Sequence, residues 1–220
     1  NIHHEIFENI PVINYKYRVM GNHNISLDIQ TIYVCNDSTT KPIVIDSSVS
    51  NFSLSPVYFC GSGTAVFINL TSHYAAIDNY LWSFGDGTQD NGVNTSHIYS
   101  VPGNYTVELV GTTINGCKDS TILKDTIKVF NLPTATISGN SIVCLTPSTI
   151  LQYTSTVSSV DAIAKYKWTI DADSVANTPD LNYNYRVPGN HNIILDIQTI
   201  NGCTYSITTT IVIDSIVSNF

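Results

Sequence analysis

Apolar and polar side chains alternate along much of this chain, and clusters of turn-forming residues interrupt the alternation. Between residues 104 and 113, Tyr105, Val107 and Leu109 fall on one face of an extended segment, as the two-residue period of a strand requires. No stretch combines helix-favouring residues with a helical period. Turns rich in Gly and Pro bound the alternating segments and predict strands in the central region near 56–60, 64–70, 78–84, 97–100, 104–113 and 120–129.

A long internal repeat organises these segments. Residues 14–52 recur as residues 182–220 at a constant offset of 168, with 28 of the 39 positions identical. A central copy is more divergent but keeps the frame, because a tyrosine and a glycine recur in every copy, as Tyr17, Tyr99 and Tyr185 and as Gly21, Gly103 and Gly189. The tyrosine spacings, 99 − 17 = 82 and 185 − 99 = 86, are those of one immunoglobulin-sized unit.

The repeat predicts three domains. Residues 1–50 form the C-terminal half of a first copy, 51–131 a complete second copy, and 132–220 a complete third copy with the start of a link to a next one. The chain begins with Asn1 rather than Met, and the first copy lacks its early strands, so we expect a segment of a longer protein. The alternative is a half sandwich that strands from a neighbouring chain complete.

Two motifs in the second copy characterise the repeat unit. Residues 82–88 read WSFGDGT and residues 97–107 read HIYSVPGNYTV. Together they resemble the motifs of the PKD (polycystic kidney disease) domain, an immunoglobulin-like β-sandwich, in the cysteine-containing form common in Bacteroidetes surface proteins. The resemblance implies an all-β fold of tandem antiparallel sandwiches whose core and turns are built by Trp82, Phe84, Gly85, Asp86, Gly87, Tyr99, Pro102, Gly103, Trp168, Tyr185 and Gly189.

Composition narrows the function classes. The chain holds nine Lys plus Arg against a net charge of −8, which argues against a nucleic-acid partner because phosphate binding needs a concentrated basic face. No apolar run approaches the length of a membrane-spanning segment, so we expect no membrane insertion in this segment.

The five cysteines follow the repeat. Cys35, Cys117 and Cys203 share one late position, and Cys60 and Cys144 share an early one. The economical pairing is one disulfide in each complete copy, Cys60 with Cys117 and Cys144 with Cys203, which implies an oxidising compartment. Cys35 is then unpaired by truncation; a free thiol or an intermolecular bridge are the alternatives. A zinc site is disfavoured because no C-x-x-C pair is present.

Several residues could carry chemistry, but each has a structural interpretation that we favour. Asp86 is expected to cap its turn; the alternative is calcium, which needs six or more oxygen ligands, and no cofactor is otherwise expected. His23, His97 and His191 lie near turns without a nucleophile motif. Trp82 and Trp168 could stack on sugars but stand where immunoglobulin-like sandwiches have a core tryptophan.

Two kinds of sequence signal suggest modification. N-x-S/T sequons occur at Asn24, Asn36, Asn51, Asn69, Asn94 and Asn104. Asp followed by Ser or Thr and a small or aliphatic residue resembles the O-glycosylation motif of Bacteroidetes and would place the modification on Ser38, Ser120, Thr126, Ser174 and Ser215.

These observations predict a non-catalytic, extracellular segment of an adhesin, stalk or cell-surface filament. Its expected partners are other copies of the repeat, in the same or neighbouring chains, and surface proteins or glycans. The alternative is a spacer or substrate-binding module of a secreted hydrolase such as a chitinase or protease. The absence of any catalytic motif argues against an enzyme within this segment.

Overall fold

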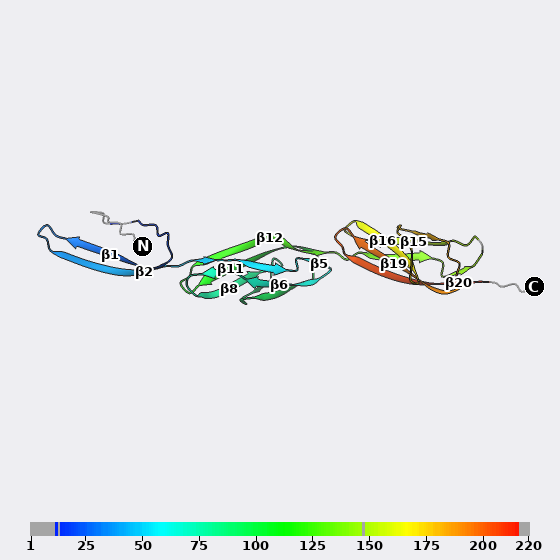
Figure 1. The fold of residues 1–220 in the computed structure, drawn as a ribbon, viewed down its shortest axis with the longest axis horizontal. Helices are drawn as coiled ribbons and strands as arrows, with labels where there is room; N and C mark the ends of the chain where they lie inside the picture. The colour runs from blue at the N-terminus through cyan, green and yellow to red at the C-terminus, as the bar shows by residue number, and fades with distance from the viewer. Residues whose placement is uncertain (1–11, 13, 147, 216–220) are drawn as a thin grey trace, which may run out of the picture. The chain divides into compact units, whose positions relative to one another are not determined.

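The computed structural model describes residues 12, 14–146 and 148–215. Every regular element in these residues is a β-strand (Figure 1), which confirms the expected all-β fold class. The chain divides into two compact units. Unit 1 runs to Ser55 and adds residues 66–95 and 106–124, and unit 2 comprises residues 56–65, 96–105 and the chain from Asp125 onward.

Most of unit 2 is a C-terminal β-sandwich. Its larger sheet has the strand order β14-β20-β19-β16-β17 and its smaller sheet the order β13-β15-β18. The short strand β14 runs parallel to the end of β20, whereas β19 pairs with both β16 and β20 in antiparallel fashion. The strands are β13 (Thr134–Gly139), β14 (Ile142–Cys144), β15 (Leu151–Ser158), β16 (Ile163–Ile170), β17 (Asp173–Ala176), β18 (Leu181–Tyr183), β19 (Gly189–Thr199) and β20 (Thr204–Asp214).

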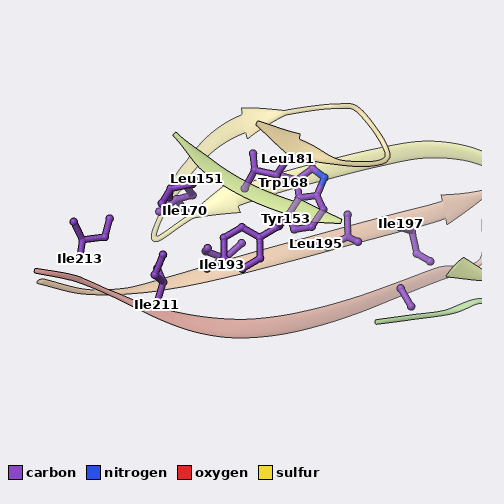
Figure 2. Packing of buried hydrophobic residues seen from close by; sticks show 11 residues of the cluster. Leu151, Tyr153, Trp168, Ile170, Leu181, Ile193, Leu195, Ile197, Ile211 and Ile213 are labelled. Carbon is purple, nitrogen blue, oxygen red and sulfur yellow. The ribbon is translucent and has the colours of Figure 1, made fainter. Parts of the chain in front are cut away.

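The core of this sandwich follows from the alternation along its strands. On β19, Ile193, Leu195 and Ile197 are buried, while the residues between them are partly exposed. Trp168 of β16 lies among these side chains and those of the smaller sheet (Figure 2). Full burial of one such aliphatic side chain contributes about 1.5–3 kcal/mol, so each of these three β19 side chains stabilises the sandwich.

The second copy has sheets of the same order. Its larger sheet is β5-β12-β11-β8-β9 and its smaller sheet β10-β6-β4, and β5 again runs parallel to the end of β12. In unit 1, the rings of Phe52 and Phe67 lie 5.1 and 5.6 Å from that of Trp82. The strands are β4 (Phe52–Ser55), β5 (Tyr58–Cys60), β6 (Gly63–Asn69), β8 (Ile77–Ser83), β9 (Gln89–Asp90), β10 (Thr95–Tyr99), β11 (Gly103–Thr113) and β12 (Lys118–Phe130).

The first copy contributes a hairpin of β1 (Gly21–Gln30) and β2 (Asn36–Ile45). Ile25, Leu27 and Ile29 of β1 are 45–58% exposed, although they occupy the positions of the fully buried Ile193, Leu195 and Ile197 in β19. Among the described residues, the β1–β2 hairpin therefore lacks a second sheet of the kind that covers β19 and β20 in the third copy. Two short strands, β3 (Ser48–Val49) and β7 (Ser72–His73), pair with each other in antiparallel fashion. In the sequence, β3 follows the hairpin and β7 precedes β8.

The strands expected in the second copy all form, with boundaries displaced by a few residues. The expectation missed β4, because Phe52–Ser55 is only four residues long and Pro56 follows it at once. It also missed the two-residue strands β3, β7 and β9. β3 and β7 pair with each other across more than twenty residues, and β9 is too short to show an alternating pattern.

Candidate functional site

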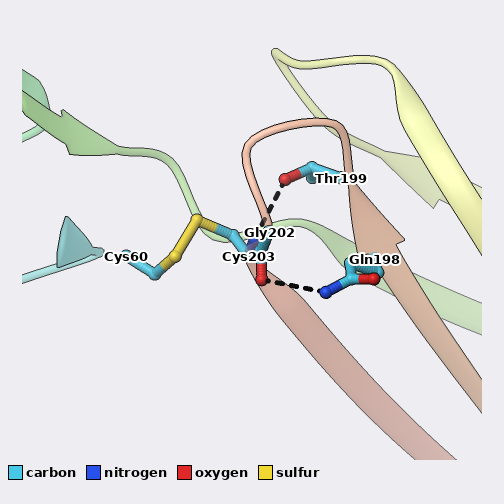
Figure 3. The surroundings of a disulfide bond; sticks show 5 residues. All are labelled: Cys60, Gln198, Thr199, Gly202 and Cys203. Carbon is cyan, nitrogen blue, oxygen red and sulfur yellow. Dashed lines mark hydrogen bonds between the residues drawn. A yellow bond between two sulfur atoms is a disulfide. The ribbon is translucent and has the colours of Figure 1, made fainter. Parts of the chain in front are cut away.

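The one disulfide among the described residues joins two different copies of the repeat. Cys60 ends β5 of the second copy, and Cys203 lies in the turn that follows β19 of the third (Figure 3). Their Cα atoms are 5.5 Å apart, and 143 residues separate them in sequence. Both cysteines belong to unit 2. Cys35, Cys117 and Cys144 are free, so the predicted pairs Cys60–Cys117 and Cys144–Cys203 are wrong in this structure.

The length of a strand explains why the predicted pairs do not form. Cys203 immediately precedes the first residue of β20. Cys144, by contrast, is the strand partner of Asp214, the last residue of β20. An 11-residue strand is about 35 Å long, and a disulfide needs Cα atoms within about 7 Å. The second copy shows the same separation. Cys117 immediately precedes β12, whereas Cys60 is the strand partner of Phe130, the last residue of β12.

The turn that carries Cys203 is held by its own hydrogen bonds. The Thr199 amide donates to the Cys203 carbonyl at 2.9 Å, and the Cys203 amide donates to the Thr199 hydroxyl at 3.1 Å. Gly202 takes a φ of +87°, which glycine adopts without steric cost. The side chain of Cys203 is fully buried, so this turn fixes the direction in which the thiol of the third copy can bond.

A second joint, in unit 1, links the hairpin of the first copy to the second copy. Asp46 follows β2, and its carboxylate accepts hydrogen bonds from the Ala75 amide at 3.0 Å, the Thr113 hydroxyl at 2.5 Å and the Asn115 side-chain amide at 3.3 Å. The Thr113 hydroxyl is the main cause that lowers the pKa of Asp46 below its usual range. No local motif marks Asp46, because only its distant partners distinguish it from other exposed aspartates.

The same joint has a second set of contacts. The Ser50 amide donates to the Asp119 carboxylate, and the Ser50 hydroxyl donates to the Asp119 carbonyl, both at 2.7 Å. Thr121 in turn donates its hydroxyl to the Ser50 carbonyl. The segment between the first two copies is thus bonded along its length to the second copy.

The Gly-Asp-Gly turn is closed by Asp86. Its carboxylate accepts from the Thr88 amide at 3.0 Å and from the Thr88 hydroxyl at 2.6 Å, the contacts of a turn-capping aspartate. Gly85 and Gly87 have φ values of +85° and +92°. At Gly85 a Cβ would lie 2.5 Å from the Thr106 carbonyl oxygen, so this glycine also permits a close backbone approach.

Both predicted core tryptophans are fully buried. The indole of Trp82 donates to the Gly92 carbonyl at 2.8 Å, and that of Trp168 donates to the Thr178 carbonyl at 3.0 Å. Each bond spans ten residues, so the two copies hold the tryptophan in the same way. Neither ring has a free face on which a sugar could stack.

The remaining motif residues are distributed between core and turns. Phe84 and Tyr99 are buried, and the Tyr99 ring lies 4.7 Å from that of Tyr105. Pro102 lies exposed in the turn before β11, and Gly103 begins that strand. Gly189, with a φ of +125°, begins β19.

A cluster around Tyr185 is the most site-like arrangement in the third copy. His191 Nδ1 lies 2.8 Å from the Asp171 carboxylate and Nε2 lies 2.9 Å from the Val187 carbonyl. Both ring nitrogens of His191 therefore lie within hydrogen-bond distance of an oxygen atom. Tyr185 donates its hydroxyl to Asp171 at 3.1 Å.

Electrostatics in this cluster favour the charged carboxylate. The hydrogen bond from His191, followed by that from the Asn192 amide, lowers the pKa of Asp171. Burial, followed by the hydrogen bond to Asp171, raises the pKa of Tyr185. Tyr185, His191 and the Asn192 amide all contact the Asp171 carboxylate, so the cluster holds the loop around Asp171 in place.

The candidate O-glycosylation residues differ in exposure. Ser38, Ser120 and Ser174 are exposed, whereas Thr126 and Ser215 are half-buried. Among the described residues no group of three or more His, Cys, Asp or Glu side chains is placed to hold a metal ion. That same part of the chain contains no helix that could span a membrane.

Comparison with known proteins agrees with this architecture. The PKD domain family matches residues 62–129. Collagenase ColA of Bacillus cereus is 30% identical over 115 residues, which are 51% of this chain and 11% of that protein, so the chain spans about a tenth of this relative.

Two solved PKD1 domains are also similar. That of the Vibrio cholerae metalloprotease PrtV is 28% identical, covering 38% of this chain and 96% of that domain, with a TM-score of 0.34. That of Vibrio anguillarum Epp is 25% identical, covering 38% and 95%, with a TM-score of 0.33. PKD and immunoglobulin-like domains are typically non-catalytic accessory modules of extracellular proteins. Residues 62–129, within the central copy, are thus the part of the chain that matches the PKD domain family.

Proposed function

We propose that this chain is a tension-resisting segment of a large extracellular adhesin, stalk or cell-surface filament, in which copies of one sandwich follow each other in series. The observation that carries this proposal is the bond between Cys60 and Cys203, because it fastens the second copy to the third. A disulfide of this kind persists in an oxidising compartment, which supports an extracellular location. The partners are other copies of the repeat together with surface proteins or glycans.

A covalent joint suits a chain under tension. Without it, a pulling force on the chain would pass through the segment from Phe130 to Pro133 and then through the third copy. With it, force enters at Cys60 and leaves through Cys203, and the 143 residues of separation cannot be drawn out. Such an array resists extension even at pulling forces that would break the hydrogen bonds of its sheets, because the disulfide carries the force.

Single-molecule pulling between the two ends of the chain tests this role. A fully extended residue spans about 3.5 Å, so the protected segment of 143 residues corresponds to about 500 Å of contour length. We expect the oxidised protein to withhold that length and the reduced protein to release it. The Cys144→Ser variant should behave as the wild type. Equal contour lengths with and without reductant would contradict a disulfide that carries the tension.

The second candidate is an accessory module of a secreted hydrolase, which the similarity to Collagenase ColA favours. Such a module would bind a polymeric substrate, and exposed aromatic side chains such as Tyr58 and Tyr74 would be suited to contact it. Co-sedimentation with insoluble collagen and with chitin distinguishes the candidates. Retention on either polymer that the Tyr58→Ala or Tyr74→Ala variant loses would favour the hydrolase module.

A further inference from the structure

The late cysteines of all three copies lie in one and the same kind of turn. In each, the amide of a threonine four residues earlier donates to the cysteine carbonyl at 2.9 Å, and the threonine hydroxyl accepts from the cysteine amide at 3.1 to 3.2 Å. The residue before the cysteine has a positive φ in every case, of 68°, 82° and 87° at Val34, Gly116 and Gly202. The bonded Cys203 is therefore matched in backbone geometry by Cys35 and Cys117.

The early cysteines also share one place. Cys60 and Cys144 each end a three-residue strand that runs parallel to the last residues of a long one, opposite Phe130 and Asp214. In both copies the next amide bonds to that opposite residue, from Gly61 at 2.8 Å and from Leu145 at 2.7 Å. Cys144 is free and exposed, so it has the geometry of Cys60 without its partner.

We propose that Cys144 bonds to the late cysteine of a further copy that follows the third, as Cys60 bonds to Cys203. By the same rule, Cys117 receives a bond from the early cysteine of the copy before it. One disulfide would then fasten each copy to the next along the whole array. This inference concerns how the copies are joined, and it stands whether the array serves adhesion or substrate binding.

The sequence indicates which kind of copy would complete this joint. Residues 46–52 (DSSVSNF) lead directly into the second copy, and residues 214–220 (DSIVSNF) repeat them at the end of the third. The junction after the third copy therefore matches the junction before the second. Cys144 lies in the copy that precedes one of these junctions, and Cys117 lies in the copy that follows the other. The chain therefore contains both cysteines of such a joint, but in two different junctions.

Formation of the bond is ordinary thiol–disulfide chemistry. The two thiols lose two protons and two electrons as the Sγ–Sγ bond forms, and a small disulfide oxidant such as oxidised glutathione is reduced to two thiols. The attacking species is a thiolate, and Cys144 is exposed and able to react with the small disulfide first.

An extended chain tests the proposal. In this chain, residues 1–220 are followed directly by a second copy of residues 53–131, so that Phe220 is joined to Ser53 as Phe52 is in the native sequence. The original Cys117 is changed to Ser, so that the Cys117 of the added segment is the only one present. After oxidative refolding with glutathione, non-reducing peptide mapping should find Cys144 linked to the added Cys117. The Cys60–Cys203 peptide serves as the internal check that the chain has folded. Cys35 and the added Cys60 should remain as free thiols.

Three results would overturn the proposal in a chain that retains the Cys60–Cys203 bond. The first is that Cys144 and the added Cys117 both react with maleimide. The second is a covalent dimer through Cys144, which would assign it to contacts between chains. The third is a bridge from Cys144 to the added Cys60. As a matched control, Cys144→Ser should leave the added Cys117 reactive while Cys60–Cys203 still forms, and protection of that thiol in this variant would also contradict the assignment.

Discussion

Breaking the Cys60–Cys203 bond should destabilise the third copy without altering its packing. Cys203 is fully buried, so replacing it would also create a core defect. The Cys60→Ser change avoids this, because it leaves Cys203 in place as a small buried apolar residue. The variant therefore isolates the effect of the covalent tie.

The magnitude follows from the loop that the bond closes. When the third copy unfolds alone, β5 stays paired with β12, so Cys60 remains beside Phe130. The closed loop then runs from residue 130 to residue 203, and 203 − 130 = 73 residues. In the chain-entropy model a loop of this size contributes about 4 kcal/mol. This is less than the value for the full separation of 143 residues, because the folded second copy already constrains the rest.

Native-state hydrogen exchange measures this quantity directly. Amides in the centres of β16 and β19 should exchange about a thousandfold faster in Cys60→Ser than in the oxidised wild type, since each tenfold corresponds to about 1.4 kcal/mol. The wild type under reductant should match the variant. Cys144→Ser, which removes an exposed free thiol, should leave the exchange rates unchanged. A change below tenfold in Cys60→Ser, or an equal change in Cys144→Ser, would refute the loop argument.

Three further predictions concern the turns and the joint. Gly85→Ala should lower the free energy of unfolding, measured by urea titration, by about 2–4 kcal/mol, because it adds a clash with the Thr106 carbonyl to the strain of a positive φ. Gly87→Ala is the control. Gly87 has a φ of +92° but nothing within 4 Å of an added Cβ, so this change should lower it by only about 1–2 kcal/mol. The Asp171 carboxyl has a lowered pKa in the folded state, so its stabilising effect is present above the unfolded pKa of about 3.9 and is lost as the pH falls through the lower folded value. The difference in urea midpoint between wild type and Asp171→Asn should accordingly shrink from pH 6 to pH 3, and a constant difference would contradict this sign. Asp46→Ala removes the acceptor for Ala75, Thr113 and Asn115, so limited proteolysis between residues 46 and 51 should become faster, whereas Asp37→Ala in the exposed end of the β1–β2 hairpin should have no effect on it.

The local pattern of the sequence was sufficient for the fold class and for most strands. Alternation on β11 and β19 places Val107 and Leu109, or Ile193 and Leu195, on one buried face, and this is a property of neighbouring residues. The tryptophans could be assigned to the core from the motif alone. The His191–Asp171 contact was not foreseen, because its two members are 20 residues apart and only the fold brings them together.

The sequence by itself determined that the late cysteine recurs in all three copies and the early one in two, because a repeat conserves position along the chain. It could not determine which cysteines bond, because a repeat does not state which ends of two long strands lie together. Only the tertiary structure decided that. The late cysteine precedes the first residue of β12 or β20, and the early cysteine lies on a short strand beside the last residue of the same long strand, about 35–45 Å away. Cys60, beside the end of β12 in the second copy, therefore bonds to Cys203, in the turn before β20 of the third copy.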